Sequence, residues 1–496
     1  MRKYIWTILL MTVLPGYAQN RDMSDTICRN LSGKEYYAIY PVRKNPWAAA
    51  LQVAGLDGLS WSVSKYLAKK PFADISLATI KRNMDTGFVW DVDEFPTNMV
   101  AHPYQGGLNF ATSRAWGMSY LESFPYSFAG SFVWEMFLEN EPPSINDLIT
   151  TSIGGMAYGE VMHRISSGIL NNQARGWNRA ARELSAFVIN PMRGVQRLVT
   201  GDMWRHGFSS YADETGGTPV SFSLGLGWRS LMIPRLPDSG NMYLTLNYIY
   251  NNPFEVDGRT PFEYFELYGD LNIGNKQPFL GDIRITGLLF GETFGFRRSE
   301  MLIGLFQQYS FHDSNAINDK ETGKPVVPYR ISETAAFGPG AICRITFPDN
   351  LMLECKGFVT GIMLGGYYTD YFRFGKRDYN FGSGFSYRAS VGLSVGDRLK
   401  VSGETQGYKL YTVDGYRQKN YQESDELYLN SAGDKGSGFI TMNRIDAKVR
   451  IVDELRFGAK INWIMRYNRY KEIPEKLTSS ARMKSNDVRF YVEYTF

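Results

Sequence analysis

Apolar and polar residues alternate along most of the second half of this chain. The clearest run is Leu455 to Asn468, in which every second residue is apolar and mostly charged or amide side chains stand between them. A period of two places the apolar residues on one face of a β-strand and the polar residues on the other. We therefore expect the charged face to line a polar lumen and the apolar face to meet lipid, as in a membrane β-barrel.

Twelve runs of this kind are predicted beyond residue 215. They are roughly 219–231, 240–250, 261–273, 281–292, 299–312, 333–346, 350–364, 379–396, 397–411, 439–451, 454–468 and 485–496. If the first strand begins in the periplasm, the odd-numbered connections should be long and the even-numbered ones short. This alternation holds from the fifth strand onward. The second connection is longer than the rule expects, so ten or fourteen strands also fit.

The register of the predicted strands places particular residues on each face. Charged residues between 444 and 450 should line the lumen, whereas Ile445 and Val449 should face lipid. Cys343 and Cys355 should pair directly across the turn at 348–350 and face lipid. We expect both to be free thiols that act as small apolar groups.

The last predicted strand continues to the last residue. From Val488 to Phe496 every second residue is apolar or aromatic. This ending resembles the C-terminal signal of Gram-negative outer-membrane β-barrels, which typically finishes in Phe. The resemblance implies that the barrel-assembly machinery reads Phe496. An ordinary soluble edge strand is the alternative.

The first 18 residues have the pattern of a signal peptide. Met1–Lys3 is positively charged, the apolar stretch 4–14 follows, and Gly16 and Ala18 are the small residues of a cleavage site. We therefore expect export and cleavage after Ala18. Beyond this leader the sequence has no uninterrupted run of about 18 apolar residues, so no transmembrane helix is predicted.

Composition and charge agree with an exported barrel. Aromatic residues make up 15% of the chain and there are 49 glycines, and the mean hydropathy of −0.29 is untypical of a helical membrane protein. A net charge of +4 over 496 residues gives no footprint for nucleic acid. Three cysteines are too few for a disulfide scaffold. The expected partners are outer-membrane lipid, the barrel-assembly machinery and a periplasmic partner; no cofactor is identified.

Residues 19–215 contain helical patterns instead of the period of two. Helices are expected at about 46–67, 72–84, 106–118, 124–139, 145–170 and 178–199. Ser144 should cap the fifth of these, and Gly155 with Gly159 give it a face for close packing. A twelve-stranded barrel is too narrow to enclose about 180 residues. We therefore expect a helical periplasmic domain at 19–215 and a barrel at 216–496, and leave open whether one segment plugs the barrel.

Four short polar blocks follow one another between residues 90 and 160. They are Trp90-Asp91-Val92-Asp93-Glu94-Phe95-Pro96-Thr97-Asn98, His102-Pro103-Tyr104-Gln105-Gly106, Trp134-Glu135, and Gly154-Gly155 with Gly159-Glu160. In this order they resemble the W-x-D-x-D-x-F-x-x-N, H-P-Y-x-G, W-E and G-G-x-x-x-G-E blocks of a family of uncharacterised exported bacterial proteins, classed as a domain of unknown function. The first block departs slightly in register, because Asp91 directly follows Trp90. The resemblance covers about residues 45–200 and implies no known activity.

The same blocks offer candidate metal ligands. Glu160 and His163 stand three residues apart, so both project from one side of a helix. Together with His102 and Glu135 they form a possible set of His and carboxylate ligands. The signal is weak, because two such E-x-x-H pairs are needed for a di-metal bundle and the chain has one.

Acid–base catalysis is the second chemical possibility. His102 could act as a base oriented by Asp91, Asp93 or Glu135. The remaining candidates are Glu160 as a further acid and Ser113 or Ser144 as a nucleophile. No G-x-S-x-G motif occurs.

A structural role for these residues is the simpler interpretation. In a packed helical domain, buried His and carboxylate groups cap helix ends and bind loop backbone. We therefore expect a non-enzymatic outer-membrane protein, either a narrow pore gated by its helical domain or an envelope scaffold. The alternative is an enzyme that acts on outer-membrane lipid or glycan through His102, Glu135 and Glu160.

Overall fold

The structure, a computed structural model, describes residues 39–40, 44–206, 208–209, 218–234, 236, 239–318, 325–372, 374–416, 431–473 and 477–496. The predicted signal peptide lies outside these residues. The chain divides into two compact units. The barrel unit consists of Val220–Phe496 together with two short segments, Phe88–Ala101 and Ser144–Thr150. The helical unit consists of the described residues in the remainder, up to Pro219.

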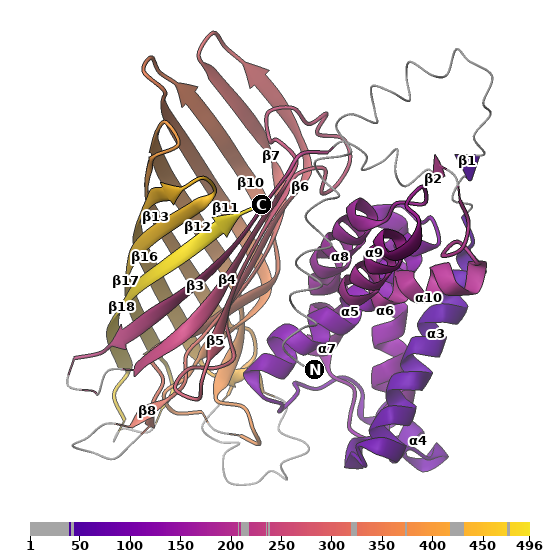
Figure 1. Ribbon diagram of the computed structural model, residues 1–496. Coiled ribbons are helices and arrows are strands. Elements are labelled where there is room, and N and C mark those ends of the chain that lie inside the picture. The colour runs from indigo at the N-terminus through magenta and orange to yellow at the C-terminus, as the bar shows by residue number, and fades with distance from the viewer. Residues whose placement is uncertain are drawn as a thin grey trace. The chain divides into compact units, whose positions relative to one another are not determined.

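Twelve antiparallel strands close into a barrel (Figure 1). They are β3 (Val220–Met232), β4 (Ser239–Tyr250), β5 (Phe265–Ile273), β6 (Leu280–Gly295), β7 (Ser299–Asp313), β10 (Arg330–Thr346), β11 (Leu351–Tyr368), β12 (Tyr379–Val395), β13 (Leu399–Thr412), β16 (Gly436–Val452), β17 (Leu455–Tyr470) and β18 (Ser480–Thr495). Each pairs with its sequence neighbours, and β18 pairs with β3 to close the ring. The predicted count of twelve is confirmed, with bounds that differ by a few residues.

The connections distinguish the two ends of the barrel. The short-turn end carries the tight connections 296–298, 347–350, 396–398 and 453–454, the start of β3 and the C-terminal residue. The long-loop end carries 314–329, 369–378, 413–435 and 471–479. Connection 251–264, between β4 and β5, also lies at the short-turn end but is long, as the sequence indicated for the second connection. Its Val256 and Tyr264 fold inward and pack against Leu302 and Phe358.

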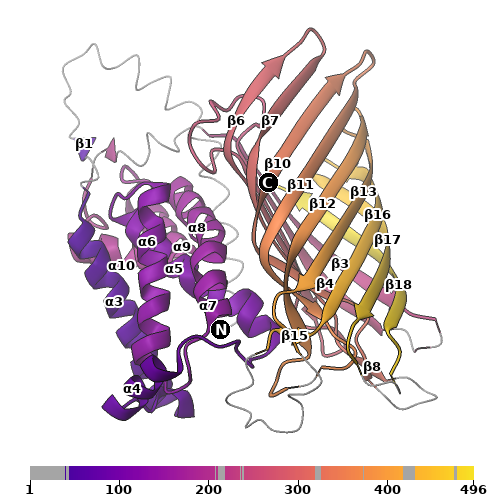
Figure 2. The ribbon, with the colours of Figure 1, turned by 180° about the vertical axis from the view of Figure 1, so that it is seen from behind.

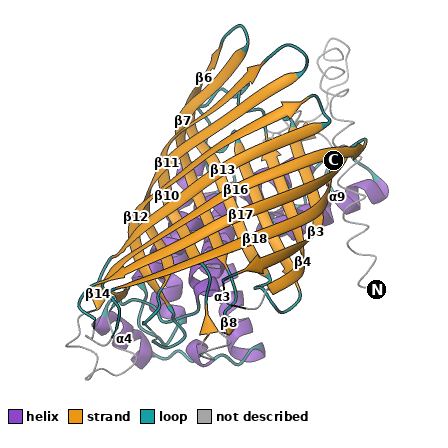
Figure 3. Ribbon diagram, turned by 90° about the vertical axis from the view of Figure 1, so that its left-hand side faces the viewer, coloured by secondary structure: helices purple, strands orange, loops and turns teal. Residues whose placement is uncertain are grey.

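The strand register confirms which face is which. The strands of the barrel wall are steeply tilted (Figure 3). Along β16, the side chains of Ile445 and Val449 point outward and are each 50% exposed. Between them Asp446 is buried and accepts a hydrogen bond from the hydroxyl of Tyr491, which lies two strands along the wall on β18. Cys343 pairs directly with Cys355, and both are free thiols. Apolar side chains outside and charged side chains inside are the pattern of a barrel in lipid.

The helices fall close to the predicted ranges. Those of the helical unit are α3 (Pro46–Ser62), η1 (Val63–Leu67), η2 (Pro71–Ala73), α4 (Leu77–Thr86), α5 (His102–Ala115), α6 (Tyr120–Val133), η4 (Trp134–Leu138), η5 (Thr150–Gly154), α8 (Gly155–Ile169), α9 (Gly176–Ile189) and α10 (Pro191–Thr200). Figure 2 shows α3, α5, α6 and α8 running side by side. Taken singly, no described helix is both long and apolar enough to cross a membrane.

One predicted helix cap is wrong in detail. The barrel unit contains η3 (Thr97–Ala101) and α7 (Ile145–Ile149), and α7 runs on through η5 into α8, as the sequence predicts for 145–170. Ser144 does occupy the N-cap position, but its side chain makes no capping hydrogen bond. Asn146 on the first turn instead accepts a hydrogen bond from the Asp91 backbone amide.

Glycines let α5 and α8 pack with their backbones in contact. A Cβ on Gly106 would lie 1.7 Å from the carbonyl oxygen of Thr151, and one on Gly155 would lie 2.5 Å from the backbone of Gly106. Gly159 is equally tight against Phe110. The predicted G-x-x-x-G face therefore forms the closest helix contact of the bundle.

Candidate functional site

The first sequence block, Trp90 to Asn98, packs against the barrel wall, and we call this contact the joint. Residues 88–101, which we call the rim segment, belong to the barrel unit. Trp90 packs against Phe381, and Phe95 packs against Phe311 and Tyr379, with ring centroids 5.1–5.2 Å apart. Tyr379 and Phe381 lie on the same side of β12 as the exposed Phe385, because alternate residues share a face. The rim segment therefore covers the outward face of the long-loop end and does not plug the lumen.

Polar residues of the same block fix the joint. The Asn98 amide donates to Asp91 Oδ2 at 2.7 Å and to the Tyr379 hydroxyl at 2.6 Å. Arg377, in the connection before β12, donates to the Asp91 carbonyl at 2.9 Å. Burial lowers the pKa of Arg377 to about 10, which leaves it charged at neutral pH. The motif residues Trp90, Asp91, Phe95 and Asn98 thus act in assembly rather than in chemistry.

Asp93 is placed differently from its neighbours. Its carboxylate is partly exposed and lies 3.9 Å from Lys376 Nζ, while its carbonyl accepts a hydrogen bond from Tyr379. It belongs to the barrel unit, whereas His102 and Glu135 belong to the helical unit. A role for Asp93 in orienting His102 remains a prediction.

His102 and Glu135 are brought together within the helical unit. His102 begins α5 and Glu135 lies in η4, and a ring nitrogen of one is within 4.8 Å of a carboxylate oxygen of the other. Glu135 is buried and His102 is half-buried. The pair has the residue types needed for a proton transfer or for two ligands of a cation.

Glu160 and His163 lie in a separate network. Glu160 is fully buried and accepts hydrogen bonds from Arg114 at 2.7 and 3.2 Å and from Arg164 at 2.9 Å. His163 Nδ1 lies 3.4 Å from a guanidinium nitrogen of Arg193. Two guanidinium groups neutralise the glutamate and a third faces the histidine. The E-x-x-H pair is therefore built as an ion-pair network, which repels a metal cation from the His side.

The two clusters are also far apart. His102 and Arg114 are twelve residues apart on α5, which is about 18 Å along a helix axis. Glu160 is bound to Arg114 and its neighbour Gly159 packs on Phe110, so Glu160 lies beside the second half of α5 and not at its start, where His102 lies. A single site that combines His102, Glu135 and Glu160 is not formed. Ser113 is not poised as a nucleophile either, because its hydroxyl is buried and donates to the Phe110 carbonyl.

The largest polar assembly is in the barrel lumen. Asp487 on β18 accepts hydrogen bonds from Arg229 on β3 at 2.9 Å and from Arg489 at 2.8 Å, and all three are buried. Arg229 also donates to Asn272 on β5, and to the hydroxyl of Tyr329, which precedes β10 on the far wall. Arg489 is paired with Asp270. This network crosses the lumen and leaves its charges neutralised.

Further links join opposite walls nearer the middle of the barrel. Arg284 on β6 donates to Glu404 on β13 at 2.9 Å, and Arg444 on β16 lies 3.8 Å from Asp282 on β6. In the ring of twelve, β6 and β16 face each other across the barrel. These partners were missed by sequence reasoning, which assigns charges to the lumen but not to one another. The only available signal was their inward position in each strand.

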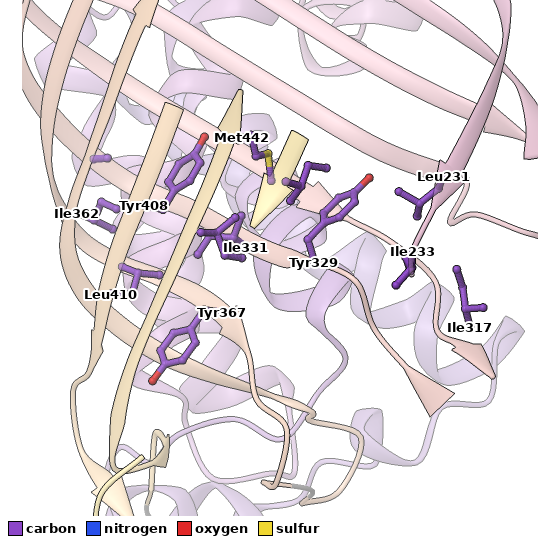
Figure 4. Close-up of a cluster of buried hydrophobic side chains, with 13 residues drawn as sticks. Leu231, Ile233, Ile317, Tyr329, Ile331, Ile362, Tyr367, Tyr408, Leu410 and Met442 are labelled. Carbon is purple, nitrogen blue, oxygen red and sulfur yellow. The ribbon is translucent and has the colours of Figure 1, made fainter. Parts of the chain in front are cut away.

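Apolar residues fill the lumen toward the long-loop end. Figure 4 shows this lumen cluster, and its members come from six barrel strands and from nearby connections. They are Leu231, Ile233, Ile317, Tyr329, Ile331, Ala336, Ile362, Tyr367, Tyr408, Leu410, Ile440, Met442 and Ile464. On the short-turn side of the ion-pair links lies a cavity of about 270 Å³. Its charged lining includes Lys356, Arg388, Lys400 and Glu493.

Comparison with known proteins finds one family model that matches part of the chain and several solved structures that are weakly similar to the barrel. Residues 87–192 match the family described as a domain of unknown function, DUF3943. No curated protein matches the chain. Among solved structures, the NanC porin is similar at 8% identity over 55% of this chain and 98% of that chain, with a TM-score of 0.27. A TodX monoaromatic hydrocarbon channel mutant is similar at 10% identity over 56% and 91%, with a TM-score of 0.22. OmpT, an outer membrane protein of Vibrio cholerae, is similar at 8% identity over 56% and 98%, with a TM-score of 0.21.

The physical features of the barrel are sufficient to identify its environment. It is closed, so it has no free strand edge, and its outward face is apolar while its interior is charged. Lipid requires both properties of a β-structure that spans it. The chain contains a β-barrel of the outer-membrane type, and residues 87–192, which include the rim segment and much of the helical unit, match DUF3943.

Proposed function

We propose that the protein is an outer-membrane scaffold, in which a barrel with a closed lumen anchors the helical unit in the envelope. The observation that supports this is the set of links across the lumen. Arg284–Glu404 and Arg444–Asp282 join opposite walls, and the apolar lumen cluster occupies the section beyond them. An open pore needs a continuous water path, and these links together with this cluster support a lumen that is closed to water.

The side chains proposed to close the lumen all belong to the barrel unit. The rim segment packs on the outward face of the wall, so its release would not open the lumen. This argues against a pore that is gated by the helical unit. As part of the same proposal, the short-turn end with Phe496 lies in the periplasm, where the assembly machinery reads it. The expected periplasmic partner would then meet the chain at this end.

Electrical recording separates a scaffold from a gated pore. The full chain, reconstituted in planar lipid bilayers beside an open porin as positive control, should give no conductance steps. A full-length W90A/F95A variant, which weakens the joint, should also give none. Conductance of the wild type, or opening of this variant alone, would contradict the scaffold.

A second function, catalysis on lipid or glycan, has one observation in its favour, the proximity of His102 and Glu135. It predicts that H102A and E135Q each abolish turnover of an outer-membrane lipid or glycan by correctly folded protein. Metal analysis of the purified chain before and after H102A tests the ligand version of the same idea. A wild-type protein with neither turnover nor bound metal excludes both.

A further inference from the structure

Two helices of the helical unit, α9 and α10, bury charged side chains and expose apolar ones. On α9, Arg179, Arg182 and Glu183 are buried, whereas Trp177 is 90% exposed. On α10, Arg193 and Arg197 are buried and Val199 is 73% exposed. Two of these arginines are bound inside the unit: Arg197 donates to both oxygens of Glu183, and Arg179 donates to the Met203 carbonyl. A soluble amphipathic helix buries its apolar stripe instead.

The longer helices carry an exposed band without charged groups. On α3 and η1, the exposed side chains between Lys44 and Lys65 include Trp47, Leu51 and Leu59. The one charged residue between these lysines is Asp57, which is buried. The twenty helical residues up to Lys65, residues 46–65, rise about 30 Å, close to the ~30 Å hydrocarbon thickness of a bilayer.

A second helix shows the same band. On α6 and η4, Glu122 and Glu139 bound a stretch in which Phe128 and Val133 are exposed. Glu135, the charged residue between these two glutamates, is buried. On α4, by contrast, the charged Lys81 is exposed.

The interior of the unit is also of the membrane type. Gly106, Gly155 and Gly159 bring backbones into contact, and the Ser127 hydroxyl donates to the Gly106 carbonyl across the helix pair. Small residues and interhelical hydrogen bonds are what hold helices together in lipid. The polar groups that lower the hydropathy of each single helix therefore face inward, away from any lipid.

From these observations we infer that the helical unit is embedded in the outer membrane, with the bands on α3 and α6 and the outward faces of α9 and α10 against lipid acyl chains. The bundle crosses as a whole, with its ion pairs enclosed, and not as a set of independently apolar helices. The occupant of the exposed apolar surface is thus the bilayer, and the chain is a composite of helical bundle and barrel. This goes beyond the scaffold proposal, because the scaffold would hold equally with a periplasmic helical unit.

Spin-label accessibility in vesicles tests the inference. The full chain with its three cysteines replaced by serine receives one new cysteine, L51C or F128C in the bands, or K81C on α4. V449C in the barrel wall is the lipid control and D397C in a short turn is the water control. Each is labelled with a nitroxide and reconstituted in phosphatidylcholine–phosphatidylglycerol vesicles. Collisions with oxygen and with a water-soluble nickel complex are then compared.

The L51C and F128C labels should match V449C, with frequent oxygen collisions and few nickel collisions, and K81C should match D397C. All five positions are on the surface, so folding is checked by the heat-dependent migration of the barrel. Nickel collisions at L51C and F128C equal to those at K81C would show a water-exposed unit and overturn the inference. Few collisions with either reagent would show a protein partner or second copy on the bands, and would overturn it as well. Neither result bears on conductance, so the scaffold proposal fails or stands separately.

Discussion

Removing the carboxylate of Asp487 should destabilise the barrel strongly. In D487A, the guanidinium groups of Arg229 and Arg489 stay buried but lose their shared anion. Breaking a buried ion pair by removing one partner costs about 3–5 kcal/mol. Arg229 keeps Asn272 and Tyr329, and Arg489 keeps Asp270, so we expect a loss near 3 kcal/mol.

A surface pair in the same barrel provides the matched control. Asp397 lies 3.7 Å from Arg450 at the short-turn end, and its side chain is 80% exposed. Because exposed pairs contribute about 0–1 kcal/mol, D397A should change little. The assay is reversible urea unfolding of the full chain in phospholipid vesicles, followed by tryptophan fluorescence. Equal stability of D487A and D397A would refute the claim that the lumen network holds the barrel closed.

Three further predictions concern packing, register and assembly. G106A should destabilise the helical unit by about 1–3 kcal/mol or more, because its Cβ meets a carbonyl oxygen. G55A, where a Cβ meets nothing within 4 Å, should instead stabilise the helix by about 0.5–1 kcal/mol. If G106A and G55A changed the free energy of unfolding in urea in the same direction, the packing described here would be contradicted. In a cysteine-free background, D446C should react with a water-soluble maleimide and V449C should not, and the reverse would mean a register shifted by one residue. Deleting Phe496, whose ring stacks on Phe222, should lower the amount of assembled barrel more than F222A does; equal or unchanged levels on membrane blots would remove its role as a signal.

The strands were predictable because lipid and lumen impose opposite polarity on alternate residues. This is why the outward position of Ile445 and Val449 could be predicted from sequence alone. The direct pairing of Cys343 with Cys355 could be predicted in the same way. Lumen partners did not follow, since Arg444 and Asp282 are far apart in sequence and meet only after the ring closes. Periodicity gives the face of a residue, and closure of the barrel gives its neighbour across the lumen.

The candidate site was predictable only in part, because residue type does not determine environment. His102 and Glu135 do approach each other, whereas Glu160 is neutralised by Arg114 and Arg164 from inside the bundle. The sequence also does not show that Trp90 and Phe95 lie on the barrel, because their partners are about 200 residues or more away. Reversed polarity of the helices was hidden for a related reason. A helical period shows that a helix has two faces, but not which of them is buried.

A structure of the full chain in lipid nanodiscs, determined by electron cryomicroscopy, tests the account most directly. It should show a closed lumen with the Arg444–Asp282 and Arg229–Asp487 links in place, and one lipid belt that encloses both the barrel and helices α3, α5, α6 and α8. A continuous water-filled path through the barrel would contradict the scaffold. A lipid belt around the barrel alone, with the helical unit outside the disc, would contradict the composite membrane unit.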